Sequence, residues 1–175
     1  MKFRLVIPLL LLILFINSLH AQKTADSILN EAYEQATLEN KNVLIIFHAS
    51  WCSWCKKLDE NLNNEKIKSF FDNNYVIKHL TVDESKDKKH LETPGAYSFL
   101  VKYMGKKAGL PFWLIFDKNR GLIGNSYGSN GKNLGCPSSE KEIIDFKKTL
   151  KKTSHLTEEE LTIIGDVFLI KKKTK

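Results

Sequence analysis

Two cysteines that follow a buried strand constrain what this sequence can fold into more than any other feature. Residues 43–47 form an unbroken run of aliphatic and aromatic side chains, which is typical of a strand covered on both faces. The run leads into the segment Trp51-Cys52-Ser53-Trp54-Cys55. We therefore expect Cys52 at a strand-to-helix junction and Cys55 one helical turn further along the chain.

This position suits thiol chemistry, because the thiolate rather than the thiol is the nucleophile. A free cysteine, with a pKa of about 8.5, supplies little thiolate at neutral pH. The unpaired N–H groups and the dipole at a helix N-terminus favour the anion. Cys55 is placed to attack a mixed disulfide formed on Cys52. The spacing thus indicates a nucleophile together with the residue that releases its product.

Two other interpretations of the pair are an inert structural disulfide and half of a zinc site. Zinc needs four ligands, usually in paired clusters, and the remaining candidates are Cys136 and five histidines scattered along the chain. We therefore predict no metal. Cys136 lies in a loop rich in glycine and asparagine, and it is either a spare thiol or an additional redox or intermolecular partner.

The N-terminal residues have the order of a secretory signal peptide. Residues 1–4 carry two positive charges, residues 5–16 are apolar, and residues 17–21 turn polar and small. The apolar run is shorter than the roughly 20 residues that a membrane span needs. We expect residues 1–21 to be cleaved after Ala21, so that the mature chain is exported, has no stable membrane span, and works where disulfides persist.

The charge distribution argues against a nucleic-acid partner. The formal charge is +7, but six of the 27 basic residues lie at the two ends of the chain, in residues 2–4 and 171–175. The rest of the chain has 21 basic and 20 acidic side chains, so the body of the protein is nearly neutral. A further charged run, residues 84–89, is expected to be a solvated loop.

Hydrophobic periodicity predicts helices that alternate with strands. The expected helices cover residues 26–39, 56–61, 67–74 and 95–107, the last capped by Thr93, and two more begin at capping boxes at Ser139 and Thr157; the expected strands cover residues 43–47, 75–82, 112–116 and 122–127. A β-α-β unit followed by a hairpin and a closing helix predicts an α/β fold, with a mixed central sheet and helices on both faces. We expect one domain over residues 22–155 and a C-terminal helical extension with a lysine-rich tail over residues 156–175.

Residues 43–57 resemble the active-site strand and helix of the thioredoxin superfamily. Their Trp-Cys-x-Trp-Cys-Lys segment is most similar to exported bacterial thioredoxin-like proteins and to the C-terminal domain of the transmembrane reductase DsbD. Leu110 and Pro111, ahead of a predicted strand, resemble the cis-proline loop that faces the dithiol in that superfamily. The resemblance runs from about residue 25 to residue 150, and it implies a thioredoxin fold for residues 22–155.

The resemblance also implies an activity. It implies a thiol-disulfide oxidoreductase without a cofactor, which acts on proteins with thiols or disulfides, works with an upstream thiol donor or acceptor protein, and resides in the periplasm. Cys52 and Cys55 are then the catalytic residues, with Cys52 meeting the substrate and Cys55 resolving the mixed disulfide. Pro111 positions the substrate in this scheme, and Leu110 offers its backbone to an extended substrate strand.

Trp51 and Trp54 are expected to form an exposed apolar patch around the dithiol, which docks extended or unfolded partners. The alternative function is a binding or chaperone-like module of the same fold, in which the disulfide is incidental. A pure binding module needs neither cysteine, so the presence of both favours the enzyme.

Two departures from the superfamily pattern affect the mechanism. Ile46 occupies the place, six residues before the first cysteine, where the superfamily has a buried acid, so Cys55 needs another proton-transfer group or water. His48 is the candidate that the sequence offers. Ser53 and Trp54 bring no charge between the cysteines, so the direction of electron flow stays open.

Overall fold

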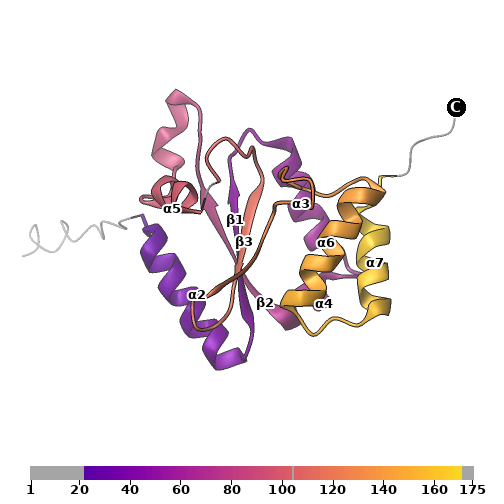
Figure 1. Ribbon diagram of the computed structural model, residues 1–175. Helices are drawn as coiled ribbons and strands as arrows, with labels where there is room; N and C mark the ends of the chain where they lie inside the picture. The colour runs from indigo at the N-terminus through magenta and orange to yellow at the C-terminus, as the bar shows by residue number, and fades with distance from the viewer. Residues whose placement is uncertain (1–21, 104, 171–175) are drawn as a thin grey trace, which may run out of the picture.

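Helices are interspersed with strands along the chain (Figure 1). The computed structural model describes residues 22–103 and 105–170; the predicted signal peptide and the lysine-rich tail at residues 171–175 lie outside the described residues. In chain order the elements are α2 (Ala25–Glu39), β1 (Asn42–His48), α3 (Ser53–Leu62), α4 (Lys68–Asn74), β2 (Tyr75–Thr81), the 3₁₀ helix η1 (Lys86–Leu91), α5 (Ala96–Lys102), β3 (Phe112–Phe116), β4 (Leu122–Asn125), α6 (Glu140–Thr153) and α7 (Glu158–Phe168).

The four strands form one mixed sheet in the order β2-β1-β3-β4. Strand β1 is parallel to β2 and antiparallel to β3, and β3 is antiparallel to β4. Helices α2 and α5 lie on one side of the sheet, and α3, α4, α6 and α7 lie on the other (Figure 1). The predicted α/β fold with a mixed central sheet and helices on both faces is confirmed.

Strand β1 is buried on both faces, which explains its uninterrupted apolar sequence. Val43, Ile45 and Phe47 belong to the core between the sheet and the helices α2 and α5. Leu44 and Ile46 belong to the core on the opposite side, under α3, α4, α6 and α7. The sheet therefore separates two apolar cores, and the chain leaves the end of β1 for a separate small cluster that contains Cys52 and Cys55.

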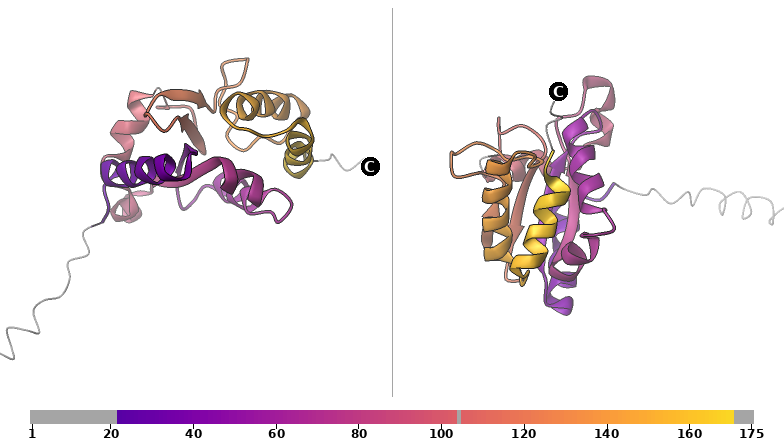
Figure 2. Two further views of the ribbon diagram at one scale, coloured as in Figure 1. Left: turned by 90° about the horizontal axis from the view of Figure 1, so that it is seen from below. Right: turned by 90° about the vertical axis from the view of Figure 1, so that its right-hand side faces the viewer.

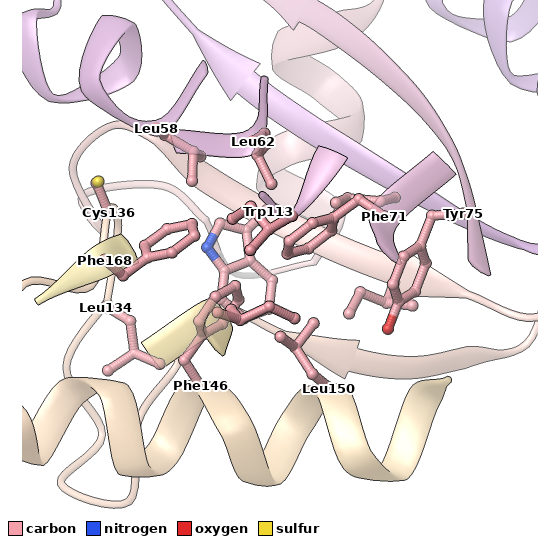
Figure 3. Close-up of a cluster of buried hydrophobic side chains, with 14 of the residues drawn as sticks. Leu58, Leu62, Phe71, Tyr75, Trp113, Leu134, Cys136, Phe146, Leu150 and Phe168 are labelled. Atoms are coloured by element: carbon pink, nitrogen blue, oxygen red, sulfur yellow. The ribbon is translucent and has the colours of Figure 1, made fainter. Parts of the chain in front are cut away.

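Trp113 of β3 lies in the middle of the core under α6 and α7 (Figure 3). Its indole Nε1–H donates a hydrogen bond to the Gly135 carbonyl oxygen at 2.9 Å, so burial leaves no unpaired donor. Helices α6 and α7 lie side by side (Figure 2), and the rings of Phe146 and Phe168 lie 5.1 Å apart between their centroids. Helix α7, which comes from the segment expected to be an extension, thus contributes side chains to this core.

Helices α6 and α7 begin at the two predicted capping boxes. At each start the hydroxyl of the N-cap residue, Ser139 or Thr157, accepts from the backbone N–H three residues later, and the carboxylate of Glu142 or Glu160 accepts from the N-cap N–H.

Among residues 22–103 and 105–170, no helix has the length and apolar character needed to cross a membrane.

The helix expected at residues 95–107 is shorter at both ends in the structure. Its N-cap is Gly95, which has a φ of 84°, and not Thr93. The Thr93 hydroxyl instead accepts a hydrogen bond from the Thr81 N–H at 3.1 Å. This bond joins the chain before α5 to the end of β2.

The C-terminal boundary of α5 depends on Gly105. A Cβ atom at this position would lie 2.1 Å from the Leu100 side chain, so the chain can pass this close to the helix only as glycine. The chain turns away after Tyr103, and the prediction of a helix as far as residue 107 is wrong.

Candidate active site

Cys52 and Cys55 are joined by a disulfide at the N-terminus of α3. Cys52 is the N-cap residue of this helix, and its Sγ accepts a hydrogen bond from the Cys55 N–H at 3.1 Å. A tight turn precedes it, in which the Cys52 N–H donates to the Ala49 carbonyl oxygen at 3.1 Å. The first sulfur therefore occupies the position where helix N–H groups stabilise a thiolate in the reduced state.

The loop before β3, which contains Leu110 and Pro111, meets the disulfide through Leu110. The Leu110 side chain packs against the buried cluster of Ala49, Cys52 and Cys55. The Leu110–Pro111 peptide bond is cis, as the resemblance implies. The fold thus brings together the two motifs that the sequence analysis quoted from distant parts of the chain.

Asn133 holds the proline loop from the other side. Its side-chain Nδ2 donates to the carbonyl oxygens of Gly109, at 3.1 Å, and of Pro111, at 2.9 Å. Its Oδ1 accepts from the Gly135 N–H at 3.1 Å. The sequence analysis did not single out Asn133, because nothing in a loop rich in glycine and asparagine indicates which distant backbone one amide contacts.

Trp51 and Trp54 are both exposed, with 59% and 48% of their surface accessible, as expected. The Trp51 indole is also fixed, because its Nε1–H donates to the Asp83 carbonyl oxygen at 2.8 Å. Two large apolar side chains thus flank a disulfide whose own residues, Cys52 and Cys55, are buried.

Glu84 is a second residue, after Asn133, whose contact near the site the sequence analysis did not predict. Its Oε1 accepts from the Ser50 N–H at 2.5 Å and its Oε2 accepts from the Ser50 hydroxyl at 2.8 Å. The residue is buried although it begins the run 84–89, which was expected to be a solvated loop. For Glu84 that expectation is wrong, since a run of charges gives no signal of a contact with the loop before Cys52.

A thioredoxin-like family model matches residues 24–118, which is more than half of the chain. The chain belongs to the thioredoxin-like family. No curated protein matches it. Among solved structures, a disulphide isomerase from Xylella fastidiosa Temecula1 is 17% identical, with a TM-score of 0.50 over 85% of this chain and 90% of that one.

Two further solved structures have lower TM-scores. A thioredoxin from Thermus thermophilus is 17% identical, with a TM-score of 0.47 over 70% of this chain and 81% of that one. The oxidised C-terminal domain of DsbD from Neisseria meningitidis is 20% identical, with a TM-score of 0.40 over 60% of this chain and 84% of that one. At such identities, the isomerase match shows a shared fold.

In this thioredoxin-like protein, Ile46 is buried and apolar, and two histidines at β1 and β2 contact polar groups of neighbouring elements. His48, at the end of β1, has its Nε2 3.2 Å from the Thr81 hydroxyl oxygen. On β2, His79 has its Nε2 2.8 Å from Asp59 Oδ1 on α3. Burial lowers the pKa of His48 below its ordinary value, which favours the neutral imidazole at neutral pH.

Cys136 is a free, buried thiol in the core under α3 and α6 (Figure 3). The Asn61 Nδ2 lies 3.8 Å from its Sγ, and burial raises the pKa of the thiol to about 11. Over the described parts of the chain, 22–103 and 105–170, no three His, Cys, Asp or Glu side chains gather in a group that could hold a metal ion.

Proposed function

We propose that this protein is a thiol-disulfide oxidoreductase that exchanges disulfides with protein substrates. The observation that carries the proposal is the Cys52–Cys55 disulfide at the N-terminus of α3, packed against the cis Leu110–Pro111 loop. A strand end, a helix start and a second backbone segment converge on one sulfur pair, and this arrangement serves a reaction better than it serves stability alone.

The reducing reaction uses both cysteines in turn. In the dithiol state the Cys52 thiolate attacks one sulfur of a substrate disulfide, a mixed disulfide forms, and the first substrate sulfur leaves as a thiolate. Cys55 then loses its proton and attacks the Cys52 sulfur. The Cys52–Cys55 disulfide re-forms and the second substrate thiolate is released, so two electrons pass to the substrate. The oxidising reaction runs through the same steps in reverse.

Substrate binding in this proposal uses the surface beside the disulfide. Pro111 positions an extended substrate segment, and Leu110 offers its backbone to that segment as a neighbouring strand would. The exposed rings of Trp51 and Trp54 supply an apolar surface for side chains of the substrate.

We further propose that the protein is exported and works in the periplasm with an upstream thiol donor or acceptor protein. The signal-peptide pattern of residues 1–21 supports export. In this scheme residues 22–155 form the thioredoxin-like domain and residues 156–175 its C-terminal helical extension. An exported dithiol depends on another thiol protein, because its compartment favours disulfides.

A second candidate is a binding or chaperone-like module, and the exposed Trp51 and Trp54 favour it. The two functions differ in what the sulfurs do. A binding module holds unfolded chains equally well with the cysteines removed, whereas an oxidoreductase loses its turnover.

The deciding experiment is the reduction of insulin with dithiothreitol as electron source, followed by turbidity. The chain from residue 22 should accelerate the reaction, Cys52→Ser should abolish the acceleration, and Cys136→Ala should retain it. Cys55→Ala should accumulate mixed disulfides with substrate proteins, because the resolving thiol is absent. A Cys52→Ser variant as fast as the wild type would remove the proposed role of Cys52.

A further inference from the structure

The carboxylate of Glu84 is fixed against the loop that leads into Cys52. Only 4% of the residue is exposed, and both carboxylate oxygens are bound by Ser50, one by its N–H and one by its hydroxyl. Ser50 stands two positions before the first cysteine of the disulfide. A buried carboxylate is costly unless its oxygens are hydrogen-bonded, and here two donors of a single residue meet that need.

The position of Glu84 is held by bonds independent of Ser50. The Glu84 N–H donates to Glu92 Oε1 at 2.8 Å, and Lys89 forms an ion pair with the same oxygen at 2.6 Å. Trp51 Nε1–H reaches back to the Asp83 carbonyl oxygen. Residues 83–92 therefore pack against the loop that leads into Cys52, and these bonds hold the Glu84 carboxylate in a fixed position.

The charge of Glu84 is negative at neutral pH. The Ser50 N–H that donates to it holds the pKa of the carboxyl below its ordinary value, and burial only partly opposes this effect. Lys88 and His48 are the basic side chains that act on it from a distance. Burial lowers the pKa of His48, and within the described residues Glu84 takes part in no ion pair.

A negative charge here opposes a second one on Cys52. The helix N-terminus stabilises the Cys52 thiolate, while a nearby fixed carboxylate destabilises it, since like charges disfavour ionisation. A less stable thiolate makes the dithiol state less favourable relative to the disulfide. Ser53 and Trp54, between the cysteines, add no charge that would offset this effect.

We propose that Glu84 is a positioning residue that holds the Ser50 loop and, through its charge, stabilises the Cys52–Cys55 disulfide relative to the dithiol. This inference rests on the proposed oxidoreductase function and adds a direction to it. With the Glu84 charge in place, the dithiol gives its electrons to substrate disulfides more readily than it would without that charge. The residue acts on the reacting sulfur through space and contacts no substrate.

The test is the equilibrium of the pair with glutathione at pH 7. Oxidised glutathione takes two electrons from the dithiol, and the Cys52–Cys55 disulfide forms as two glutathione thiols are released with their protons. Glu84→Gln keeps the size and an acceptor oxygen but removes the charge. We expect the equilibrium constant for disulfide formation to fall about threefold and the pKa of Cys52 to fall by about one unit. The rate of iodoacetamide labelling at Cys52 against pH, read by mass spectrometry, gives this pKa.

Two matched variants distinguish the effect of the Glu84 charge from the effect of its hydrogen bonds to Ser50. Glu84→Asp keeps the carboxylate and should keep the glutathione equilibrium within about 1.5-fold of the wild type. Ser50→Ala removes one donor but leaves the charge, so it lowers stability without moving the equilibrium toward the dithiol. If Glu84→Gln does not fold, the exposed Lys88→Glu change tests the same effect with the opposite sign. It replaces a cation that acts on Glu84 by a second anion, and this added negative charge should raise the pKa of Cys52.

Equal shifts in all three variants at positions 84 and 50, or an unchanged Cys52 pKa in both Glu84→Gln and Lys88→Glu, would overturn the electrostatic role. Failure of the proposed function is separate from this outcome. It would appear as wild-type protein that does not accelerate insulin reduction, whatever the glutathione equilibrium of its cysteines.

Discussion

The imidazole rings of His48 and His79 lie 5.1 Å apart between their centroids, in an edge-on contact on neighbouring parallel strands. Only His79 has a carboxylate within hydrogen-bond distance, Asp59 on α3. Burial, and next the proximity of His79, lower the pKa of His48, while Asp59 and Glu84 oppose the shift. Burial and the second ring therefore favour the neutral imidazole at His48.

The low pKa of His48 predicts a loss of stability in mild acid. In the unfolded chain this histidine takes up a proton near its ordinary pKa of about 6.5, but in the folded protein it does so only at lower pH. The unfolded state thus binds more protons as the pH falls below 6.5, and the free energy of unfolding declines. Urea unfolding of the oxidised protein at pH 7.5, 6.5 and 5.5 measures this decline.

His48→Gln should make the decline smaller over that pH range. His90→Gln is the matched control, because His90 is exposed in η1 and its loss should leave the pH dependence unchanged. The explanation fails if both variants keep the full wild-type decline.

His48 is also the residue we expect to take the proton of Cys55, since Ile46 offers none. His48→Gln should slow the resolution of a preformed mixed disulfide at pH 7 by about tenfold or more. Stopped-flow release of a thiol leaving group from Cys52 measures the step, and its pH profile should lose the wild-type inflection. An unchanged profile would assign the proton to water.

The sequence predicted those parts of the fold that depend on residues close together along the chain. The strand β3 covers residues 112–116 as predicted, because Pro111 precedes it and a turn at Asp117 follows. The capping boxes at Ser139 and Thr157 each work within four residues of chain. Cys52 and Cys55 belong to the same class, since a strand end and a helix start define their site.

Contacts between distant residues were not predictable in this way. Glu84 and Ser50 are 34 positions apart, and Asn133 meets Pro111 across 22. The helix expected to reach residue 107 ends early because Gly105 returns against Leu100, which depends on packing. Each of these features follows from tertiary structure that the local pattern does not encode.

Trp54 should contribute to the binding of protein substrates and not to the chemical step. Trp54→Ala should raise KM for insulin about three- to tenfold with little change in kcat, because it removes an exposed apolar contact. Turnover of a small disulfide should be unaffected. Leu38→Ala, at an even more exposed apolar residue on α2, is the control, and an identical rise in KM for both variants would contradict a docking role.

The Cys136 thiol should be unreactive in the native protein. With a pKa of about 11, roughly one molecule in a thousand carries its thiolate at pH 8. Ellman's reagent should modify the oxidised native protein slowly, and unfolding in guanidinium should raise the rate at least a hundredfold. Cys136→Ala should show no reaction in either state. Equal native and unfolded rates would mean that the thiol is accessible, as an additional redox partner would require.

Phe168 links the C-terminal segment to the core that supports the active-site helix. Its side chain is 1% exposed and packs with Phe146 in the same apolar core as Leu58 of α3 and Trp113 of β3 (Figure 3). Phe168→Ala leaves a cavity and should lower the free energy of unfolding by about 3–5 kcal/mol. Urea unfolding with the disulfide intact, followed by tryptophan fluorescence, measures this loss.

The control for that measurement is Ile144→Ala on α6, where the side chain is mostly exposed and the change should stay within about 0.5 kcal/mol. A loss below about 1 kcal/mol for Phe168→Ala would mean that residues 156–175 are a separable extension of the domain. The larger loss would mean that the chain after residue 155 is needed to hold α3, and with it Cys52 and Cys55, in place.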